Sequence, residues 1–496
     1  MPSTLADWLA YLELLHPKTI ALGLERVTQV RQRLNLQSDF PIITVGGTNG
    51  KGSACAMLES MLHAAGYRVG CYTSPHLLHY NERVRIGKQQ VSDAELCASF
   101  ERIEQARCGG VGRASARDGS VGMNPDLRSD VPLTYFEFGT LAAMQCFIEH
   151  KVDVAILEVG LGGRLDAVNV FDNDCAVVTS VDIDHTDYLG ETREQIAFEK
   201  AGIFRSGKVA VCADADVPQA VTGHAEKIGA QLWRIGHEFS FEEQKTGQWD
   251  YRSIIGTRNS LPYPALRGAF QLNNASAALA ALDALKDKLP VSMEAVRRGL
   301  VEVQLAGRFQ VVPGRPQLIL DVAHNPHAAR ALAQNLAGLP PCPHTFAVFA
   351  MLKDKDMAGV AAALDPLVDT WLAAGIAAPR GATAAELAQA LQNAGVRGAI
   401  QTFPDVTEAL RYAYNAAGEN GGCDTLLMGQ LAIRLGEPTT PAKSLVMRSS
   451  RLREQTPDTP SRTRRLRAPC RECRIAAFGS FYTVAEAMAA RGLHIT

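Results

Sequence analysis

A glycine-rich segment, VGGTNGKGSA at residues 45–54, holds the residue types and spacing best suited to chemistry. In a phosphate-binding loop of the pattern G-x-x-x-x-G-K-S/T, backbone amides surround the phosphates, the lysine neutralises them and the hydroxyl reaches Mg²⁺. Lys51 is present here, but Val45 replaces the first glycine, and Gly52 takes the hydroxyl position with Ser53 one place later. The segment therefore predicts a phosphate site of altered pattern in which Lys51 binds the phosphates.

Other candidate ligands follow apolar segments. Glu158 ends the run VDVAILEVG (152–160), where a carboxylate is costly to bury without a partner. We interpret it as a ligand of the divalent cation that a nucleotide requires. His185, in VDIDHTDYLG, could equally be a metal ligand or part of a solvated turn. Ser74, in YTSPHL, is a weaker signal because serine before proline is common in turns.

Lys200 and a His/Asn turn offer further candidates. From composition, Lys200 in AFEKAGIF is typical of a lysine on an exposed helix face. Asp321, His324 and Asn325, in DVAHNPHA, could cap a helix or face a nucleotide across a cleft between two domains. These residues together predict an enzyme that uses ATP or GTP with Mg²⁺ to handle a phosphoryl group. They leave the acceptor open.

The elements that must position these residues alternate between strand and helix. The β-branched run FPIITVGG (40–47) predicts a buried strand before the glycine loop, and helical spacing after the loop predicts a helix that ends at Gly66. Together with predicted helices, further apolar runs predict an α/β fold whose parallel sheet is covered on both faces. The runs are 152–160, 175–182 and 208–214, and the helices 136–150 and 192–202. Functional residues are then expected beyond the carboxyl ends of the strands.

A second α/β pattern follows LAGRFQVV (305–312), with strands or helices expected at 317–336, 345–352 and 369–375. We therefore expect two domains, a P-loop parallel-sheet domain over residues 1–302 and a smaller Rossmann-like α/β domain over residues 303–496. Two segments break the pattern. Residues 108–131 are rich in Gly, Ser and Arg and predict a flexible loop. Residues 436–474 include nine arginines within 27 residues and could contact RNA or a membrane, but without interleaved aromatics we interpret them as a disordered insertion.

Length and composition exclude other classes. At 496 residues the chain exceeds the roughly 250 to 300 residues at which one core stops growing. Its net charge of -2 gives no argument for nucleic acid or anionic membranes, and neither a signal peptide nor a run of roughly 20 apolar residues is present, so a cytoplasmic protein is expected. Reduced, mostly buried cysteines are expected, including Cys55, Cys146 and Cys175. Cys470 and Cys473 form a lone C-x-x-C pair, which is a weak zinc signal.

At this point eight ordered segments resemble the bifunctional dihydrofolate synthase/folylpolyglutamate synthase family, within the wider group of Mur-type amide ligases whose P-loop is written G-T-x-G-K. The segments are GTNGKGS (47–53), TSPHLLHYNERVRI (73–86), LTYFEFGTLAA (133–143), LEVGLGGRLDAVN (157–169), DHTDYLG (184–190), EKAGIFR (199–205), DVAHNPHA (321–328) and FGSFYTVAEAM (478–488). They span nearly the whole chain except the irregular segments.

The resemblance implies a reaction and a set of site residues. ATP would phosphorylate a dihydropteroate or tetrahydrofolate carboxylate, and the amine of L-glutamate would attack the acyl phosphate to form an amide. A monomer without nucleic-acid or membrane partners is expected. In the family pattern, Ser74 and Glu158 would hold one Mg²⁺, and Glu158 and His185 would hold a second. Lys200 would be carbamylated, and Ser74, Pro75 and Phe136 would lie at the pterin side. ATP would be bound by Gly47, Thr48, Asn49, Gly50, Lys51, Gly52, Ser53, Asn273, Arg308, Asp321 and His324.

Two alternatives and one departure accompany the resemblance. Relatives that extend cell-wall precursors place a UDP-sugar domain before the P-loop, and the 46 residues before Gly47 are too few for it. A nucleotide-gated regulator would bind ATP without forming an amide. The departure lies near the end, where either CDTLLMG (423–429) or RIAAFG (474–479) could form the last strand of the second sheet.

Overall fold

The computed structural model describes residues 2–16, 20–109, 130–245, 247–418 and 473–493. Its first sheet has eight strands in the order β4-β3-β2-β5-β1-β6-β7-β8. The six neighbouring strands β2, β5, β1, β6, β7 and β8 are parallel. At the edge formed by β2, the strands β3 and β4 are added in antiparallel pairing. The predicted strands at 40–47, 152–160, 175–182 and 208–214 are thereby confirmed. The bounds are β1 Ile42–Gly46, β2 Val69–Tyr72, β3 Val84–Ile86, β4 Gln89–Gln90, β5 Val154–Glu158, β6 Cys175–Val178, β7 Val209–Cys212 and β8 Gln231–Arg234.

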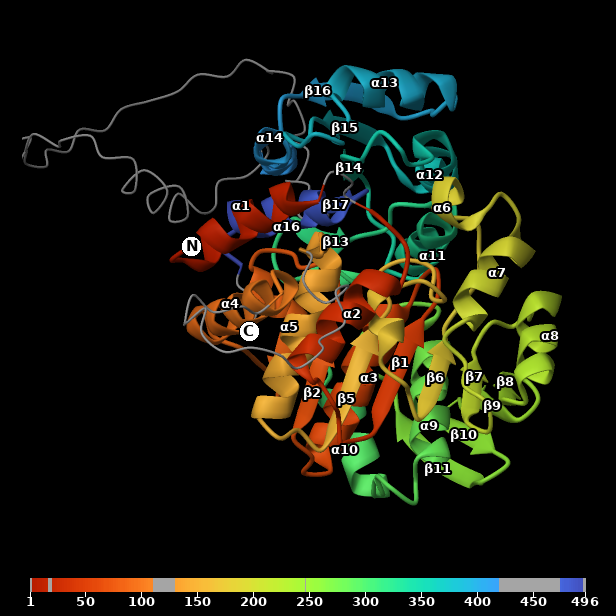
Figure 1. Cartoon of the computed structure of the whole chain (residues 1–496). Coiled ribbons are helices and arrows are strands. Elements are labelled where there is room, and N and C mark those ends of the chain that lie inside the picture. The colour runs from red at the N-terminus through yellow and green to blue at the C-terminus, as the bar shows by residue number, and fades with distance from the viewer. Residues whose placement is uncertain (1, 17–19, 110–129, 246, 419–472, 494–496) are drawn as a thin grey trace, which may run out of the picture.

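Helices cover both faces of this sheet, as the continuous apolar strands predict (Figure 1). Side chains alternate along β1, so that Ile42 enters the core on one face while Ile43 and Val45 enter the core on the other. The first face is covered by α1 Leu5–Leu15, α2 Glu25–Leu34, α4 Asp93–Arg107, α5 Tyr135–Glu149, α7 Arg193–Ala201 and α8 Gln219–Ile228. The second is covered by α3 Lys51–Ala64, α9 Gln271–Ala284 and α10 Met293–Glu302.

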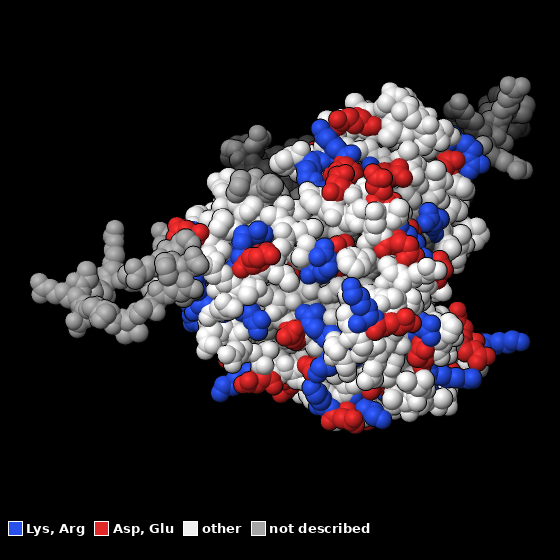
Figure 2. All heavy atoms as spheres, turned by 45° about the vertical axis from the view of Figure 1, so that its right-hand side comes forward, with Lys and Arg blue, Asp and Glu red and all other residues white. Residues whose placement is uncertain are grey.

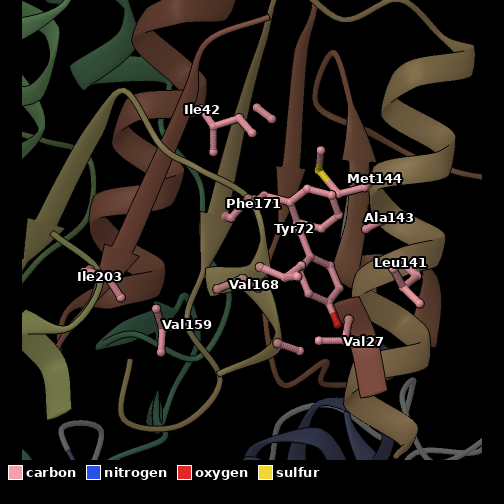
Figure 3. Packing of buried hydrophobic residues seen from close by; sticks show 14 of the residues in the cluster. Val27, Ile42, Tyr72, Leu141, Ala143, Met144, Val159, Val168, Phe171 and Ile203 are labelled. Carbon is pink, nitrogen blue, oxygen red and sulfur yellow. The ribbon is translucent and has the colours of Figure 1, made fainter. Parts of the chain in front are cut away.

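The core on the first face is built from aromatic and branched side chains. Figure 3 shows Tyr72 of β2 and Phe171 packed between the sheet and α5, which contributes Leu141 and Met144. Each of these four side chains is almost completely buried. Burial of this kind stabilises a domain by about 1.5 to 3 kcal/mol for each large apolar side chain, so α5 is held firmly against the strands that carry the candidate site.

A small antiparallel sheet is attached to α9. It consists of β9 Phe239–Glu243, β10 Gln248–Ser253 and β11 Gly256–Pro262. Asp283, buried on α9, forms an ion pair with Arg258 and accepts hydrogen bonds from the hydroxyls of Tyr251 and Ser253 at 3.1 and 2.7 Å. The paired carboxylate fixes the small sheet to the helix that begins beside the P-loop.

The second sheet has six strands in the order β12-β13-β17-β14-β15-β16, parallel except for β12. Its strands are β12 Gln310–Val312, β13 Gln317–Asp321, β14 Thr345–Phe349, β15 Thr370–Ala374, β16 Ala399–Phe403 and β17 Arg474–Phe478. Its helices are α11 Pro326–Ala337, α12 Met357–Leu364, α13 Ala384–Asn393, α14 Val406–Gly418 and α16 Phe481–Ala490. The elements predicted at 317–336, 345–352 and 369–375 are confirmed.

Strand β17 answers the question of the last strand. RIAAF pairs with β13 on one side and β14 on the other, and every residue of it is buried. The alternative segment, CDTLLMG, lies outside the described residues. The division at residues 302 and 303 stays a prediction; α10 ends at Glu302, and β12 of the second sheet begins at Gln310.

Several expectations concern segments that the structure describes only in part. Residues 110–129 of the predicted loop and 436–472 of the predicted insertion lie outside the description, as does Cys470. Cys55, Cys146 and Cys175 are buried, as expected. Over the described ranges, no helix is long and apolar enough to cross a membrane. Figure 2 shows basic and acidic side chains interspersed over one face of the molecule.

Candidate active site

A cavity of about 760 Å³ lies between the two sheets. One wall comes from the loops that follow β1, β2, β5 and β6, and the other from the loop after β13 and the start of α16. Parallel strands bring their carboxyl ends to the same edge, so the expectation that the candidate residues gather there is confirmed. All the predicted site residues line this cavity except Phe136 and Asn325.

The glycine loop joins β1 to α3, with Lys51 as the first residue of the helix. Gly47 has φ +143° and Gly50 has φ +88°, values that favour glycine. A Cβ atom would also lie 2.0 Å from the Thr179 hydroxyl at Gly47. The Lys51 ammonium donates to the carbonyl oxygens of Gly47 at 3.0 Å and Thr48 at 3.2 Å. The lysine therefore spans the loop, and the free amides at the start of α3 face the same space.

The remaining residues of the glycine loop are held by the segment that follows β6 and by α9. The Thr48 amide donates to the Ser180 carbonyl at 2.7 Å, and the Thr179 hydroxyl donates to the Asn49 carbonyl at 2.6 Å. Ser53, in the first turn of α3, is buried and lies 3.5 Å from the side-chain nitrogen of Gln271 on α9. These contacts hold the backbone in a concave form, which suits binding of an anion.

Glu158 ends β5 directly beside β1 and is 4% exposed. Its Oε2 accepts a hydrogen bond from the Ser74 amide at 3.0 Å. Burial raises the pKa of Glu158, and Lys51 opposes this shift. The cavity thus places a buried carboxylate and the Ser74 hydroxyl, both hard oxygen donors, next to the P-loop lysine.

Asp184 and His185 follow β6 and meet residues of the second sheet. The Asp184 carboxylate accepts hydrogen bonds from the Lys355 ammonium at 2.7 Å and from the side-chain amide of Asn325 at 3.1 Å. His185 has φ 53°, and its Nε2 lies 3.5 Å from Lys355. Burial lowers the pKa of His185 to about 4, so the imidazole is neutral at pH 7 and able to bind a metal. Of the two interpretations of His185, the cavity position favours the ligand over the solvated turn.

The prediction from composition that Lys200 is exposed is wrong. The side chain is 4% exposed near the end of α7, at the base of the cavity. The backbone of Gly163 packs against this turn, where a Cβ would come within 2.9 Å of the Lys200 carbonyl. Burial, with a smaller effect of Lys51, lowers the pKa of Lys200 to about 7. Helix periodicity could not find this, because the segment that covers Lys200 is distant in sequence.

The residues at and after the end of β13 include a helix cap, as predicted, and contact the opposite wall of the cavity. The Asn325 Oδ1 caps α11 by accepting from the Ala328 amide at 2.8 Å, while its side-chain nitrogen reaches Asp184. Asp321 accepts the amides of Phe309 and Ala323, each at 2.8 Å. Burial raises the pKa of Asp321 and lowers the pKa of His324 to about 4.

Arg308 and Asn273, which the resemblance assigns to ATP, both line the cavity. The Arg308 guanidinium lies 5.0 Å from the centre of the Phe481 ring and is close enough to Asp321 and Glu158 to be attracted by both carboxylates. Asn273 lines the cavity from the first turn of α9.

The three residues assigned to the pterin side, of which Ser74 is described above, differ in position. Pro75 lines the cavity, but Phe136 lies behind it. Phe136 packs against Tyr72, with ring centres 5.7 Å apart, and against Gly160, where a Cβ would clash with the ring at 2.7 Å. Phe136 thus shapes the cavity wall through Gly160.

Sequence reasoning missed Lys355, Asp166 and Asn274. Lys355 follows β14 in MLKDKDM, and its position beyond a strand end was a usable signal. Asp166 is 3% exposed, and burial raises its pKa to about 7, while the amides of Leu161 and Val168 oppose that shift. Asn274 packs against Gly50 of the P-loop, and only the fold brings these two residues together.

Comparisons with known proteins agree with this geometry. The Mur ligase middle domain model matches residues 121–282, and the Mur ligase glutamate ligase domain model matches residues 307–429. The dihydrofolate synthase/folylpolyglutamate synthase of Escherichia coli is 47% identical over 392 residues, covering 79% of this chain and 86% of the relative. The chain belongs to the dihydrofolate synthase/folylpolyglutamate synthase family. It is therefore an ATP-dependent ligase, as the resemblance implied.

Other members and their structures extend the match. The Haemophilus influenzae enzyme is 42% identical over 410 residues, covering 79% of this chain and 87% of the relative. Escherichia coli FolC in complex with DHPP and ADP has a TM-score of 0.79 at 40% identity, covering 99% of this chain and 98% of that one. A bifunctional folylpolyglutamate synthase/dihydrofolate synthase with Mn, AMPPNP and L-glutamate bound has a TM-score of 0.78 at 42% identity, with the same coverage. These complexes support ATP and a divalent cation as the expected nucleotide and cofactor.

Proposed function

We propose that this cavity joins L-glutamate to dihydropteroate, giving dihydrofolate, and to the glutamyl chain of tetrahydrofolates. The observation that carries the proposal is the convergence of Lys51 and Glu158 from the first sheet with Arg308, Asp321 and His324 from the second. Phosphoryl transfer needs cations around the phosphates and an acidic ligand for a divalent ion. Ligation also benefits from a site that excludes water, and a deep cavity between two walls suits this requirement.

The residues present fit Mg²⁺. Ser74 and Glu158 supply oxygen donors and His185 a neutral nitrogen. Within the described part of the chain, no group of three or more His, Cys, Asp or Glu side chains could hold a metal ion. This agrees with Mg²⁺, which binds through one or two carboxylates together with substrate phosphates and waters. When bound, Mg²⁺ would neutralise charge on the phosphates.

The proposed reaction proceeds in two steps. An oxygen of the acceptor carboxylate attacks the γ-phosphorus of ATP and ADP leaves, which gives an acyl phosphate. The glutamate nitrogen then attacks the acyl carbon, phosphate leaves, and the amide forms after the nitrogen loses its proton. Lys51 and Arg308 would offset the charge that develops during the first step. Asn273, Asp321 and His324 would position the nucleotide from the opposite wall.

Lys200 would act as a carbamate. Its lowered pKa leaves a neutral amine available near pH 7, and the amine nitrogen can attack CO₂ to form a carbamate with release of one proton. The resulting anion would balance the charge of Lys51, which is among the groups that lower the pKa of Lys200. Carbamylation would turn the Lys200 amine into an anion, which can bind a divalent cation and is attracted to the Lys51 ammonium.

Phosphate release tests the proposal. Purified protein is incubated with Mg·ATP and L-glutamate, and with dihydropteroate, tetrahydrofolate or no acceptor. Release that requires glutamate and an acceptor, and that is lost in Lys51→Ala, is expected. Release that is indifferent to both substrates would instead identify an ATPase or a nucleotide-gated regulator. We also propose a cytoplasmic monomer without nucleic-acid partners, and light scattering during size exclusion tests the monomer.

A further inference from the structure

Arg83 is a cation in the cavity wall without an acidic partner. It follows Glu82 on the loop that returns from Ser74 to β3 and lines the cavity. Its Nε donates to Nδ1 of His76 at 2.9 Å, and its guanidinium lies 5.4 Å from the ring centres of both Tyr80 and Tyr135. Within the residues that the structure describes, no carboxylate forms an ion pair with it. The guanidinium therefore keeps donors for a ligand.

The groups that hold Arg83 do not neutralise it. The imidazole of His76 carries no negative charge whether or not it is protonated, so it cannot neutralise the guanidinium. Burial raises the pKa of Tyr135 to about 12 and places the pKa of Tyr80 well above its usual value, so neither phenol is ionised. An arginine stacked on aromatic faces is oriented and partly dehydrated, which strengthens its bond to an incoming anion.

The loop that carries Arg83 is itself fixed. The Glu82 carboxylate is buried and accepts the consecutive amides of Leu77, Leu78 and His79 at 2.7, 2.7 and 2.6 Å. A carboxylate that satisfies adjacent amides sets the loop in one conformation. The position of Arg83 is thus established before any ligand binds.

Most other cations in the cavity wall are engaged. Lys355 is paired with Asp184, and Arg380 with Asp354. Arg308 faces Glu158 and Asp321.

The others differ from Arg83 in state or place. Lys51 spans the P-loop, and Lys200 has a lowered pKa. Arg267 is exposed and precedes Gly268, far along the chain from the Ser74 loop. Among the described residues of the cavity wall, the half-buried Arg83 is thus the cation left for a substrate anion.

Arg83 also lies close to the reacting centre. Its backbone carbonyl accepts the amide of Thr73 at 2.9 Å, and the next amide, that of Ser74, is bonded to Glu158. Dihydropteroate ends in a single carboxylate, which is the one that reacts. The terminal glutamate of a tetrahydrofolate carries a second carboxylate, a short aliphatic chain away from the reacting one.

We propose that Arg83 binds the non-reacting α-carboxylate of the terminal glutamate of the tetrahydrofolate acceptor. The inference rests on the proposed function and deepens it, because it makes Arg83 a residue that distinguishes the two acceptors. A bidentate contact between guanidinium and carboxylate would fix the glutamyl end so that its γ-carboxylate meets the γ-phosphate. Dihydropteroate has no group for this contact.

The test compares acceptors in wild type, Arg83→Met and Arg83→Lys. Loss of a charge-assisted contact predicts a rise of roughly 10- to 100-fold in the KM for tetrahydrofolate in Arg83→Met, with less than about a twofold change for dihydropteroate. Arg83→Lys should recover part of the affinity but not all, because an ammonium lacks the planar fork. Arg252→Met, which removes an exposed ion pair with Glu242, is the matched control and should behave as wild type.

An acceptor analogue supplies the second arm. Tetrahydrofolate whose terminal α-carboxylate is replaced by a carboxamide should bind wild type as weakly as tetrahydrofolate binds Arg83→Met, and the variant should not distinguish the two ligands. Equal KM values of wild type for carboxylate and carboxamide would overturn the inference. A rise in the KM for glutamate with both acceptors would also overturn it, since the carboxylate bound would be that of the incoming amino acid.

Binding separates this inference from the proposed function. Calorimetry in the presence of Mg²⁺ and AMPPNP measures the affinity of wild type and of Arg83→Met for tetrahydrofolate without turnover. An inactive wild type would count against the proposed function, whereas tetrahydrofolate that binds wild type and Arg83→Met equally would count against Arg83 alone. Thermal unfolding of each variant verifies its folding, and the carboxamide comparison in wild type needs no variant.

Discussion

Lys200 gives the prediction that tests the burial of the site most directly. Its pKa of about 7 in the folded chain lies well below the ordinary 10.5, chiefly because the ammonium would be buried. Between these values the folded chain holds a neutral amine while the unfolded chain still binds the proton. The unfolded state therefore binds more protons, and stability must rise with pH through this window at about 1.4 kcal/mol per pH unit.

The perturbation is Lys200→Met, which keeps a chain of similar length without a titrating group. In CO₂-free buffer, the free energy of unfolding of wild type relative to the variant should rise by roughly 2 to 3 kcal/mol between pH 7.5 and 9.5. Below about pH 7 the difference should become constant, because the amine is then protonated in both states. Urea unfolding followed by circular dichroism measures it, and taking the difference removes the titration of all other groups.

Parallel stability curves for wild type and Lys200→Met would refute the reasoning, because a buried amine with a lowered pKa cannot leave stability independent of pH. Bicarbonate extends the test. A carbamate no longer titrates as an amine, so added bicarbonate should flatten the pH dependence of wild type alone. ¹³C-bicarbonate should give a carbamate resonance in wild type that is missing from Lys200→Met.

Three further variants test other parts of the site. Glu158→Gln should raise the Mg²⁺ concentration for half-maximal activity at least roughly tenfold, because mutation even of residues that only hydrogen-bond to metal ligands lowers metal affinity by that factor. An unchanged Mg²⁺ titration would show that Glu158 is not a metal ligand. Gly50→Ala puts a Cβ 2.5 Å from Asn274 Oδ1 at φ +88°, so AMPPNP affinity should fall more than about tenfold by calorimetry, with about 1 to 2 kcal/mol lost in urea unfolding. Lys355→Met removes the ammonium that pairs with the buried Asp184 carboxylate and leaves the hydrogen bond from Asn325, which should cost up to about 3 to 5 kcal/mol of stability. Asp184→Asn in the same chain should partly restore the stability, and a neutral single variant would contradict this.

Local signals predicted the part of the site that is built from neighbouring residues. The strand at 40–47, the glycine loop and the helix after it were predictable because apolar β-branched residues, glycines and helical spacing follow one another directly. Glu158 was predictable from its position at the end of an apolar run. Each of these features is set within about twenty residues of sequence, where periodicity and punctuation carry information.

Residues whose roles depend on distant segments were not predictable in this way. Lys200 has the sequence of an exposed helix, and the backbone of Gly163 makes it buried. Lys355 acquires its partner only when the second sheet meets Asp184. The last strand was undecided because both candidate segments are apolar; the register between β13 and β14, which buries the small residues Ala476 and Ala477, settles it for RIAAF.

Direct contacts join the two walls of the cavity, so the position of one wall depends on the other. Asn49, in the P-loop itself, lies 2.8 Å from His327 of the second sheet's first helix, and Asp184 is bonded to Asn325 and Lys355. The loops that would bind the nucleotide phosphates are therefore the same loops that hold the second sheet. A nucleotide that binds these loops more tightly when the two walls are in contact than when they are apart must stabilise the contact. The stabilisation equals the difference in its binding free energy between the two states. The same contacts place Arg308 and His324 on the cavity wall opposite Lys51.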